Sequence, residues 1–127
     1  MAQDTLKYDG LRVLVVEDEF LVSMLLEEML ADLGCEVVGP YATLPAALAG
    51  ARGEAYDVAV VDLNLAGEKA DPIIAELAAR NVPLAIASGG YEAETGHKPT
   101  ALLNKPYSAN QLDETIDILR AALDGRG

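Results

Sequence analysis

Residues 58–68 read VAVVDLNLAGE, a run of small and β-branched apolar residues that stops on Asp62. The run is long enough for a buried strand and too short for a helix. A carboxylate directly after a buried strand is unfavourable unless a partner or a ligand uses its charge. Asp62 is therefore the first candidate functional residue, and its role depends on the strands expected beside it.

Strand and helix patterns alternate on both sides of this run. Strands are expected at residues 11–16, 35–39, 56–61, 82–87 and 100–104, each short and apolar on both faces. Helices between successive strands imply a five-stranded parallel sheet with helices covering both faces. The segment between Ser88 and Lys105 has almost no apolar periodicity, so a fourth helix there is expected to be short or frayed.

Three of the expected helices carry recognisable ends. The first has a helical apolar repeat and a C-terminal cap at Gly34; the repeat consists of Val22, Leu25, Leu26, Met29, Leu30 and Leu33. Asp71 and Pro72 are expected as the N-cap and first residue of another helix. Ser108 and Gln111 form a capping-box pattern, which predicts that the last helix begins at Ser108.

Composition restricts the class of protein. The 127 residues carry a net charge of −12, which argues against binding nucleic acid or an anionic membrane surface. A single cysteine, Cys35, and the lack of a signal-peptide pattern or an apolar run of membrane-span length favour a cytoplasmic protein. One domain is expected at 10–124, after a flexible segment at 1–9 and without an output domain.

Polar residues follow four of the five expected strands. Strand one ends in Glu17-Asp18-Glu19, and the later ends carry Asp62, Ser88 and Lys105-Pro106. In an open parallel sheet these ends meet at one edge, where functional groups collect. Clustered carboxylates open to water suit Mg²⁺, and an aspartate beside Mg²⁺ can accept a phosphoryl group. Ser88 and Lys105 would then bind oxygens of that group.

The stretches VLVVEDE, VVDLNL, IASGG and LLNKPYS resemble, in this order and spacing, the signature stretches of response-regulator receiver domains. The resemblance implies the flavodoxin-like receiver fold, with Asp62 as phosphoacceptor and Glu17 and Asp18 as the acidic metal-binding pair. It implies that Asn64 offers its backbone carbonyl to the metal, that Ser88 is the switch residue, and that Lys105 precedes a proline that is often cis. A sensor histidine kinase or histidine phosphotransfer protein would be the phosphodonor. The output would be binding to an unidentified protein partner, and the only reactions catalysed would be the domain's own phosphorylation and dephosphorylation.

The chain departs from this family at its secondary switch. The family's aromatic residue usually lies three positions before the lysine, where this chain has Leu102. IASGGY resembles instead the Phe-Ala-Thr-Gly-Gly-Tyr-like motif of a single-domain subgroup, mostly from alphaproteobacteria, with Ile86 and Ser88 replacing Phe and Thr. Tyr91 is therefore a candidate for the missing aromatic's role, and an unremarkable half-buried loop tyrosine is the alternative.

Three other functions remain open at this point. A haloacid-dehalogenase-type phosphatase also uses an aspartate nucleophile and Mg²⁺, but it needs a second aspartate where this chain has Asn64. A flavodoxin-like cofactor binder would need a phosphate-binding loop in place of Glu17-Asp18-Glu19. A pseudo-receiver that acts only in docking would normally lack one of the site residues, and none is lacking.

Overall fold

A five-stranded sheet in the order β2-β1-β3-β6-β7 forms the centre of the molecule, and all of its pairings are parallel. The computed structural model describes residues 8–65, 67–89 and 98–125. The sheet strands are β1 (Arg12–Val16), β2 (Glu36–Tyr41), β3 (Val58–Asp62), β6 (Leu84–Ser88) and β7 (Ala101–Asn104). The described helices are α1 (Phe20–Asp32), α2 (Leu44–Gly53), α3 (Asp71–Ala79) and α4 (Ala109–Gly125). The predicted fold class is confirmed.

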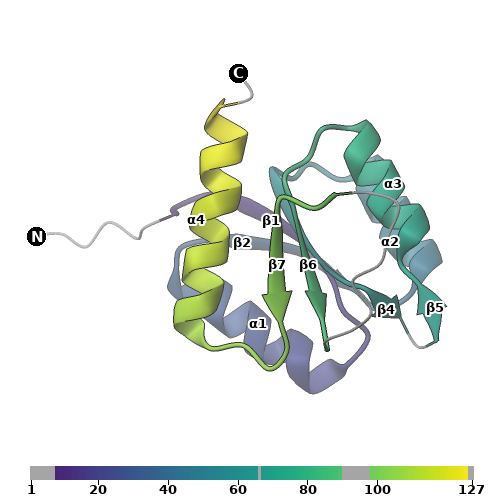
Figure 1. The fold of residues 1–127 in the computed structure, drawn as a ribbon, viewed down its shortest axis with the longest axis horizontal. Helices are drawn as coiled ribbons and strands as arrows, with labels where there is room; N and C mark the ends of the chain where they lie inside the picture. Colours follow the sequence, from purple (N-terminus) through teal and green to yellow (C-terminus); the bar gives the residue numbers. More distant parts are fainter. Residues whose placement is uncertain (1–7, 66, 90–97, 126–127) are drawn as a thin grey trace, which may run out of the picture.

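Helices cover both faces of the sheet, as Figure 1 shows, with α1 and α4 on one face and α2 and α3 on the other. Successive residues of a strand point to opposite faces. Val13 and Val15 of β1 accordingly join the core under α1 and α4, whereas Leu14 and Val16 join the core under α2 and α3. The central strand β3 is buried along its whole length. The two cores hold the strands in register and bring their carboxyl ends to one edge.

Hydrogen bonds at the helix ends confirm two of the predicted caps. Gly34, at φ +90°, lies just after α1; its N–H donates to Ala31 O and that of Cys35 donates to Leu30 O. This pattern is a Schellman cap, which needs a left-handed residue and so favours glycine. At α4, Ser108 N donates to Gln111 Oε1 at 2.8 Å and Gln111 N donates to Ser108 Oγ at 3.1 Å.

The bounds of two elements and the presence of a hairpin differ from the sequence predictions. Helix α3 begins at Asp71 itself, with Ala70 as its N-cap, so the predicted cap is displaced by one residue. Strand β2 continues past Gly39 to Tyr41 through an irregular register against β1. A two-stranded hairpin of β4 (Asn64–Leu65) and β5 (Glu68–Lys69) follows Asp62, where the sequence indicated only a loop.

Helix α1 buries most of the predicted face but differs from it at Leu25 and Ser23. Leu26 and Leu30 are buried as expected, but the third buried residue is Ser23, whose hydroxyl donates to Phe20 O. Leu25 was expected inside and is 58% exposed. The apolar residues of α1 extend around more of the helix than the sheet can cover, so periodicity alone did not select the buried side.

The segment before β1 is tied to the domain at Tyr8. The sequence places Tyr8 within a flexible segment, whereas its side chain is buried and its hydroxyl donates to Asp113 Oδ1 at 2.9 Å. The predicted short fourth helix falls largely on residues 90–97, which lie outside the described residues. No helix in the described ranges combines the length and apolar character that a membrane span requires.

Candidate functional site

The carboxyl ends of β1, β3, β6 and β7 form one edge of the sheet, at the lower side of Figure 1. Asp62 is the last residue of β3 and Ser88 the last residue of β6, and both are buried. Glu17 follows β1 directly and is only 3% exposed. Its N–H donates to Tyr41 O, so the extra length of β2 fixes the backbone at Glu17. The parallel topology therefore collects these polar groups, as predicted.

Lys105 joins the carboxylates of this edge. Its Nζ lies 2.9 Å from Glu17 Oε1, 3.3 Å from Asp62 Oδ2 and 3.9 Å from Glu19 Oε1. The lysine follows β7, and its N–H donates to Ser88 O at 2.8 Å, which holds the start of this loop against β6. One ammonium thus offsets only part of the charge of several carboxylates, and the site keeps a net negative charge.

The Asp62 carboxyl is held in an unfavourable environment for its charge. Burial raises the pKa of Asp62 from 3.8 to about 7, and the neighbouring negative charge of Glu17 adds to the rise. Two groups lower this pKa. They are the positive charge of Lys105 and the Asn64 N–H, which donates a hydrogen bond to Asp62 Oδ1 at 3.3 Å. A group that neutralises negative charge here would favour the ionised, nucleophilic form of Asp62.

Three carboxylates at this edge fit a divalent cation. Glu17, Asp18 and Asp62 each offer an oxygen, and these oxygens lie within 4.8 Å of one another. Oxygen-only ligands that are partly open to water are the set that Mg²⁺ prefers. The same cation would lower the repulsion between Asp62 and Glu17 and would thereby offset the free-energy cost of keeping both carboxylates buried.

Two further predicted residues lie beside Asp62. Ser88 pairs with Asn104 across β6 and β7, while its neighbour Ala87 pairs with Asp62, so Ser88 is placed between the acidic residue and the lysine loop. Asn64 begins the hairpin after Asp62, and its side-chain oxygen accepts from Gly67 N at 3.1 Å. The role of the Asn64 carbonyl toward a metal stays a prediction.

The predicted secondary switch is described only in part. Leu102 lies on β7 opposite Ile86 and is 55% exposed. Tyr91 lies outside the described residues, so its role as the substitute aromatic stays a prediction.

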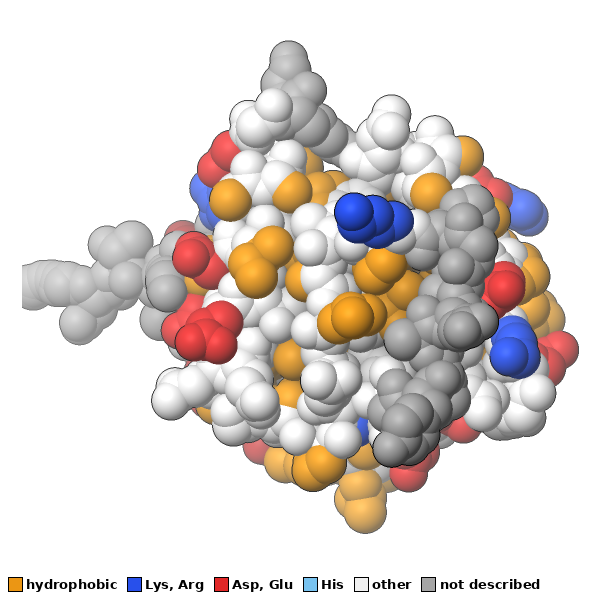
Figure 2. All heavy atoms as spheres, viewed as in Figure 1, with side chains coloured by type: hydrophobic (Ala, Val, Ile, Leu, Met, Phe, Trp, Pro, Cys, Tyr) orange, Lys and Arg blue, Asp and Glu red, His pale blue; other side chains and the backbone are white. Residues whose placement is uncertain are grey.

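The structure adds two features that the sequence analysis missed. Tyr107, two residues after Lys105, has a buried hydroxyl beside the acidic edge, and KPY in the sequence was its only signal. Helix α1 exposes a group of large apolar side chains next to the site, here called the α1 patch, which consists of Phe20, Leu21, Met24 and Leu25. In Figure 2, hydrophobic side chains protrude at the lower edge of the molecule, where Figure 1 places α1.

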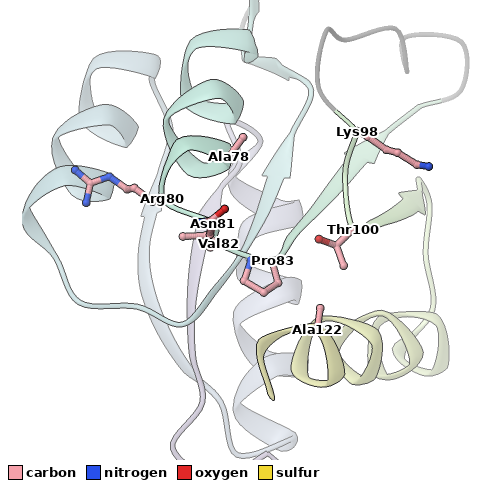
Figure 3. A pocket seen from close by; sticks show the side chains of 8 residues that line it. All are labelled: Ala78, Arg80, Asn81, Val82, Pro83, Lys98, Thr100 and Ala122. Atoms are coloured by element: carbon pink, nitrogen blue, oxygen red, sulfur yellow. The ribbon is translucent and has the colours of Figure 1, made fainter. Parts of the chain in front are cut away.

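A hollow of about 670 Å³ lies at the opposite edge of the sheet, before the start of β6 and β7. Figure 3 shows that the two cationic residues lining it, Arg80 and Lys98, point away from each other. Arg80 is also paired with Glu76 at 2.8 Å. The cationic groups of this hollow therefore do not converge on a common ligand, whereas Lys105 at the Asp62 edge lies against Glu17 and Asp62.

Comparison with known proteins assigns the family. Residues 13–117 match the model of the response regulator receiver domain, whereas no curated protein matches the chain. SdrG from Sphingomonas melonis Fr1 is 34% identical, with a TM-score of 0.75 and coverage of 87% of this chain and 97% of SdrG. The signal receiver domain of a modulated diguanylate cyclase from Desulfovibrio desulfuricans G20 is 28% identical, with a TM-score of 0.83 and coverage of 94% and 100%.

The response regulator PhyR from Brucella abortus is 27% identical, with a TM-score of 0.78. The match covers 89% of this chain and 49% of PhyR, so the chain spans about half of that protein. The expected Lys105-Pro106 cis peptide bond is also present. Because the family model spans most of the chain and the strand order agrees with the expected receiver fold, the chain belongs to the response regulator receiver domain family.

Proposed function

We propose that the protein is a phosphorylation-dependent response regulator that accepts a phosphoryl group on Asp62 and signals by binding another protein. The observation that carries this proposal is the buried Asp62 carboxylate, placed within reach of both the Lys105 ammonium and the Glu17 and Asp18 carboxylates. In the transfer, an oxygen of Asp62 forms a bond to phosphorus while the bond from phosphorus to the donor's imidazole nitrogen breaks. The product is an aspartyl phosphate.

The residues around Asp62 have separate tasks in this step. Bound Mg²⁺, held by Glu17, Asp18 and Asp62, would supply charge neutralisation for the transferred group. Lys105 is already 3.3 Å from Asp62 and can turn its ammonium toward a phosphoryl oxygen. Ser88, at the end of the neighbouring strand, supplies a hydroxyl for another oxygen. These groups position and neutralise the phosphoryl group, which is most of what catalysis of this transfer requires.

The decisive experiment is incubation with Mg²⁺ and acetyl phosphate, read by intact mass. We expect one phosphoryl adduct on the wild-type protein and none on Asp62→Asn. Continuous release of phosphate without an adduct would support the phosphatase alternative, and a folded protein with neither result would support a docking-only module. Asn64 cannot act as the second acid that the phosphatase mechanism needs, which favours the receiver.

A protein phosphodonor is supported by the α1 patch. Phe20 and Leu21 are each 73% exposed. A hollow of about 290 Å³ lies between α1, which contributes Leu25 to its lining, and the loop after β7, which contributes Pro106. Contiguous exposed apolar surface on a small domain commonly marks a protein-binding site. A histidine kinase or phosphotransfer protein that docks here would bring its phosphohistidine to the Asp62 edge.

This part of the proposal has its own test. Leu21→Ser should slow phosphotransfer from a purified histidine kinase several-fold and leave the rate with acetyl phosphate unchanged, because Asp62 itself is untouched. Ile118→Ser, at a 50% exposed position of α4, is the matched control and should behave as wild type. Equal effects of the two variants would contradict docking at the α1 patch.

A further inference from the structure

The hydroxyl of Tyr107 is buried and has no hydrogen-bond partner among the described residues. Two other tyrosines are satisfied: the Tyr8 hydroxyl donates to Asp113 Oδ1 at 2.9 Å and the Tyr56 hydroxyl to Ala51 O at 2.7 Å. A buried, unpaired hydroxyl destabilises a fold, and a phenylalanine would fill the same space without this cost. The Tyr107 ring already packs against the core under α1 and α4, so its hydroxyl calls for another explanation.

The hydroxyl lies beside the acidic edge. Tyr107 lines the 290 Å³ hollow together with Lys105 and Glu19. Burial raises the pKa of the Tyr107 phenol to about 12, and among the neighbouring charges that of Glu17 has the largest effect, ahead of Lys105 and Asp62. Lys105, which lines the same hollow as Tyr107, lies 2.9 Å from Glu17 Oε1, so Glu17 is a buried carboxylate in the neighbourhood of this hydroxyl.

Phosphorylation would change the partners of Glu17. In this structure Lys105 Nζ lies 2.9 Å from Glu17 Oε1 and 3.2 Å from Glu17 Oε2, so this pair is closer than the one with Asp62. A phosphoryl group on Asp62 adds negative charge and competes for the ammonium. The Glu17 side chain is only 2% exposed, so a Glu17 oxygen that loses Lys105 and does not face the metal needs another hydrogen-bond donor.

We propose that Tyr107 is a positioning residue for phosphoryl transfer: its hydroxyl donates a hydrogen bond to the Glu17 carboxylate when Lys105 turns to the phosphoryl oxygens. The hydrogen bond satisfies the orphan hydroxyl and fixes the orientation of a carboxylate that faces the cation. Such outer donors to metal-binding carboxylates commonly tune the affinity for the metal. The inference rests on the proposed function and assigns a specific residue to the activated state.

The variant Tyr107→Phe removes only this hydroxyl. Calorimetric titration of the full chain with beryllofluoride in saturating Mg²⁺ should show about tenfold weaker binding, the loss expected for a hydrogen bond to a charged group. The melting temperature of the metal-free variant should be equal to or higher than that of wild type, because the unpaired hydroxyl is gone. A purely structural tyrosine would lower the melting temperature and leave the affinity unchanged.

Tyr8→Phe is the matched control, since it removes a buried hydroxyl whose hydrogen bond is made in this structure, away from the acidic edge. It should lower the melting temperature and leave beryllofluoride affinity as in wild type. Wild-type affinity in Tyr107→Phe overturns the inference while leaving the proposed function standing. Failure of the wild-type protein itself to bind beryllofluoride with Mg²⁺ overturns both.

Discussion

Replacing Asp62 with asparagine should stabilise the metal-free protein at alkaline pH and have little effect at pH 4. The physical cause is the burial of the Asp62 carboxyl beside Glu17, which raises its pKa from 3.8 to about 7. Between these two values the unfolded chain releases the proton while the folded chain keeps it. Wild-type stability therefore falls as the pH rises through this window, and the full penalty is present above about pH 7.

The magnitude follows from the two pKa values. A difference between 3.8 and about 7, at about 1.4 kcal/mol per pH unit, gives an upper limit of about 4 kcal/mol. Water reaches part of this edge, and the variant also loses the attraction between Lys105 and Asp62, so a net gain of about 1–2 kcal/mol is expected. For a chain of 127 residues this corresponds to a rise in melting temperature of about 3–8 °C at pH 8.

Thermal unfolding followed by circular dichroism, in EDTA from pH 4 to pH 8.5, measures this effect. The quantity of interest is the difference in melting temperature between Asp62→Asn and wild type at each pH. Glu114→Gln, which removes an exposed carboxylate of α4, is the control and should give a small, pH-independent difference. The reasoning would be refuted if Asp62→Asn were less stable than wild type at pH 8, or if the difference in melting temperature between the two proteins were the same at every pH.

Three further predictions concern the metal, a glycine in the irregular part of β2 and a helix cap. Millimolar Mg²⁺ should raise the wild-type melting temperature by several degrees, because the ion binds only the folded state, and Asp18→Ala should remove most of this rise; an undiminished response would place the metal elsewhere. Gly39→Ala should destabilise the fold by about 2 kcal/mol or more in urea unfolding, since Gly39 has φ +104° and a Cβ there would lie 3.0 Å from Val15 O; an unchanged midpoint would contradict this. Ser108→Ala should cost about 1 kcal/mol by breaking the capping box of α4, whereas Ser108→Asp should restore much of it; equal stability of both variants would count against the cap.

The sequence alone determined the sheet and the composition of its edge. Short apolar strands separated by helices permit a parallel arrangement, and parallel strands bring their carboxyl ends together. Asp62, Ser88 and Lys105 could therefore be assigned to one edge from the sequence alone, because each directly follows or ends a strand. The caps at Gly34 and Ser108 could also be predicted from the sequence, since each depends on residues only a few positions apart.

Only the tertiary structure decided which surfaces and partners these residues have. Helical periodicity placed Leu25 inside, yet the sheet and neighbouring segments cover Ser23 and leave Leu25 58% exposed. The hairpin after Asp62 depends on pairing that local propensity did not reveal. Lys105 lies closer to Glu17 than to Asp62, and the hydroxyl of Tyr107 is enclosed beside them. These outcomes arise from contacts between segments far apart in the chain, where competing charges and packing surfaces meet only after the strands have been brought together.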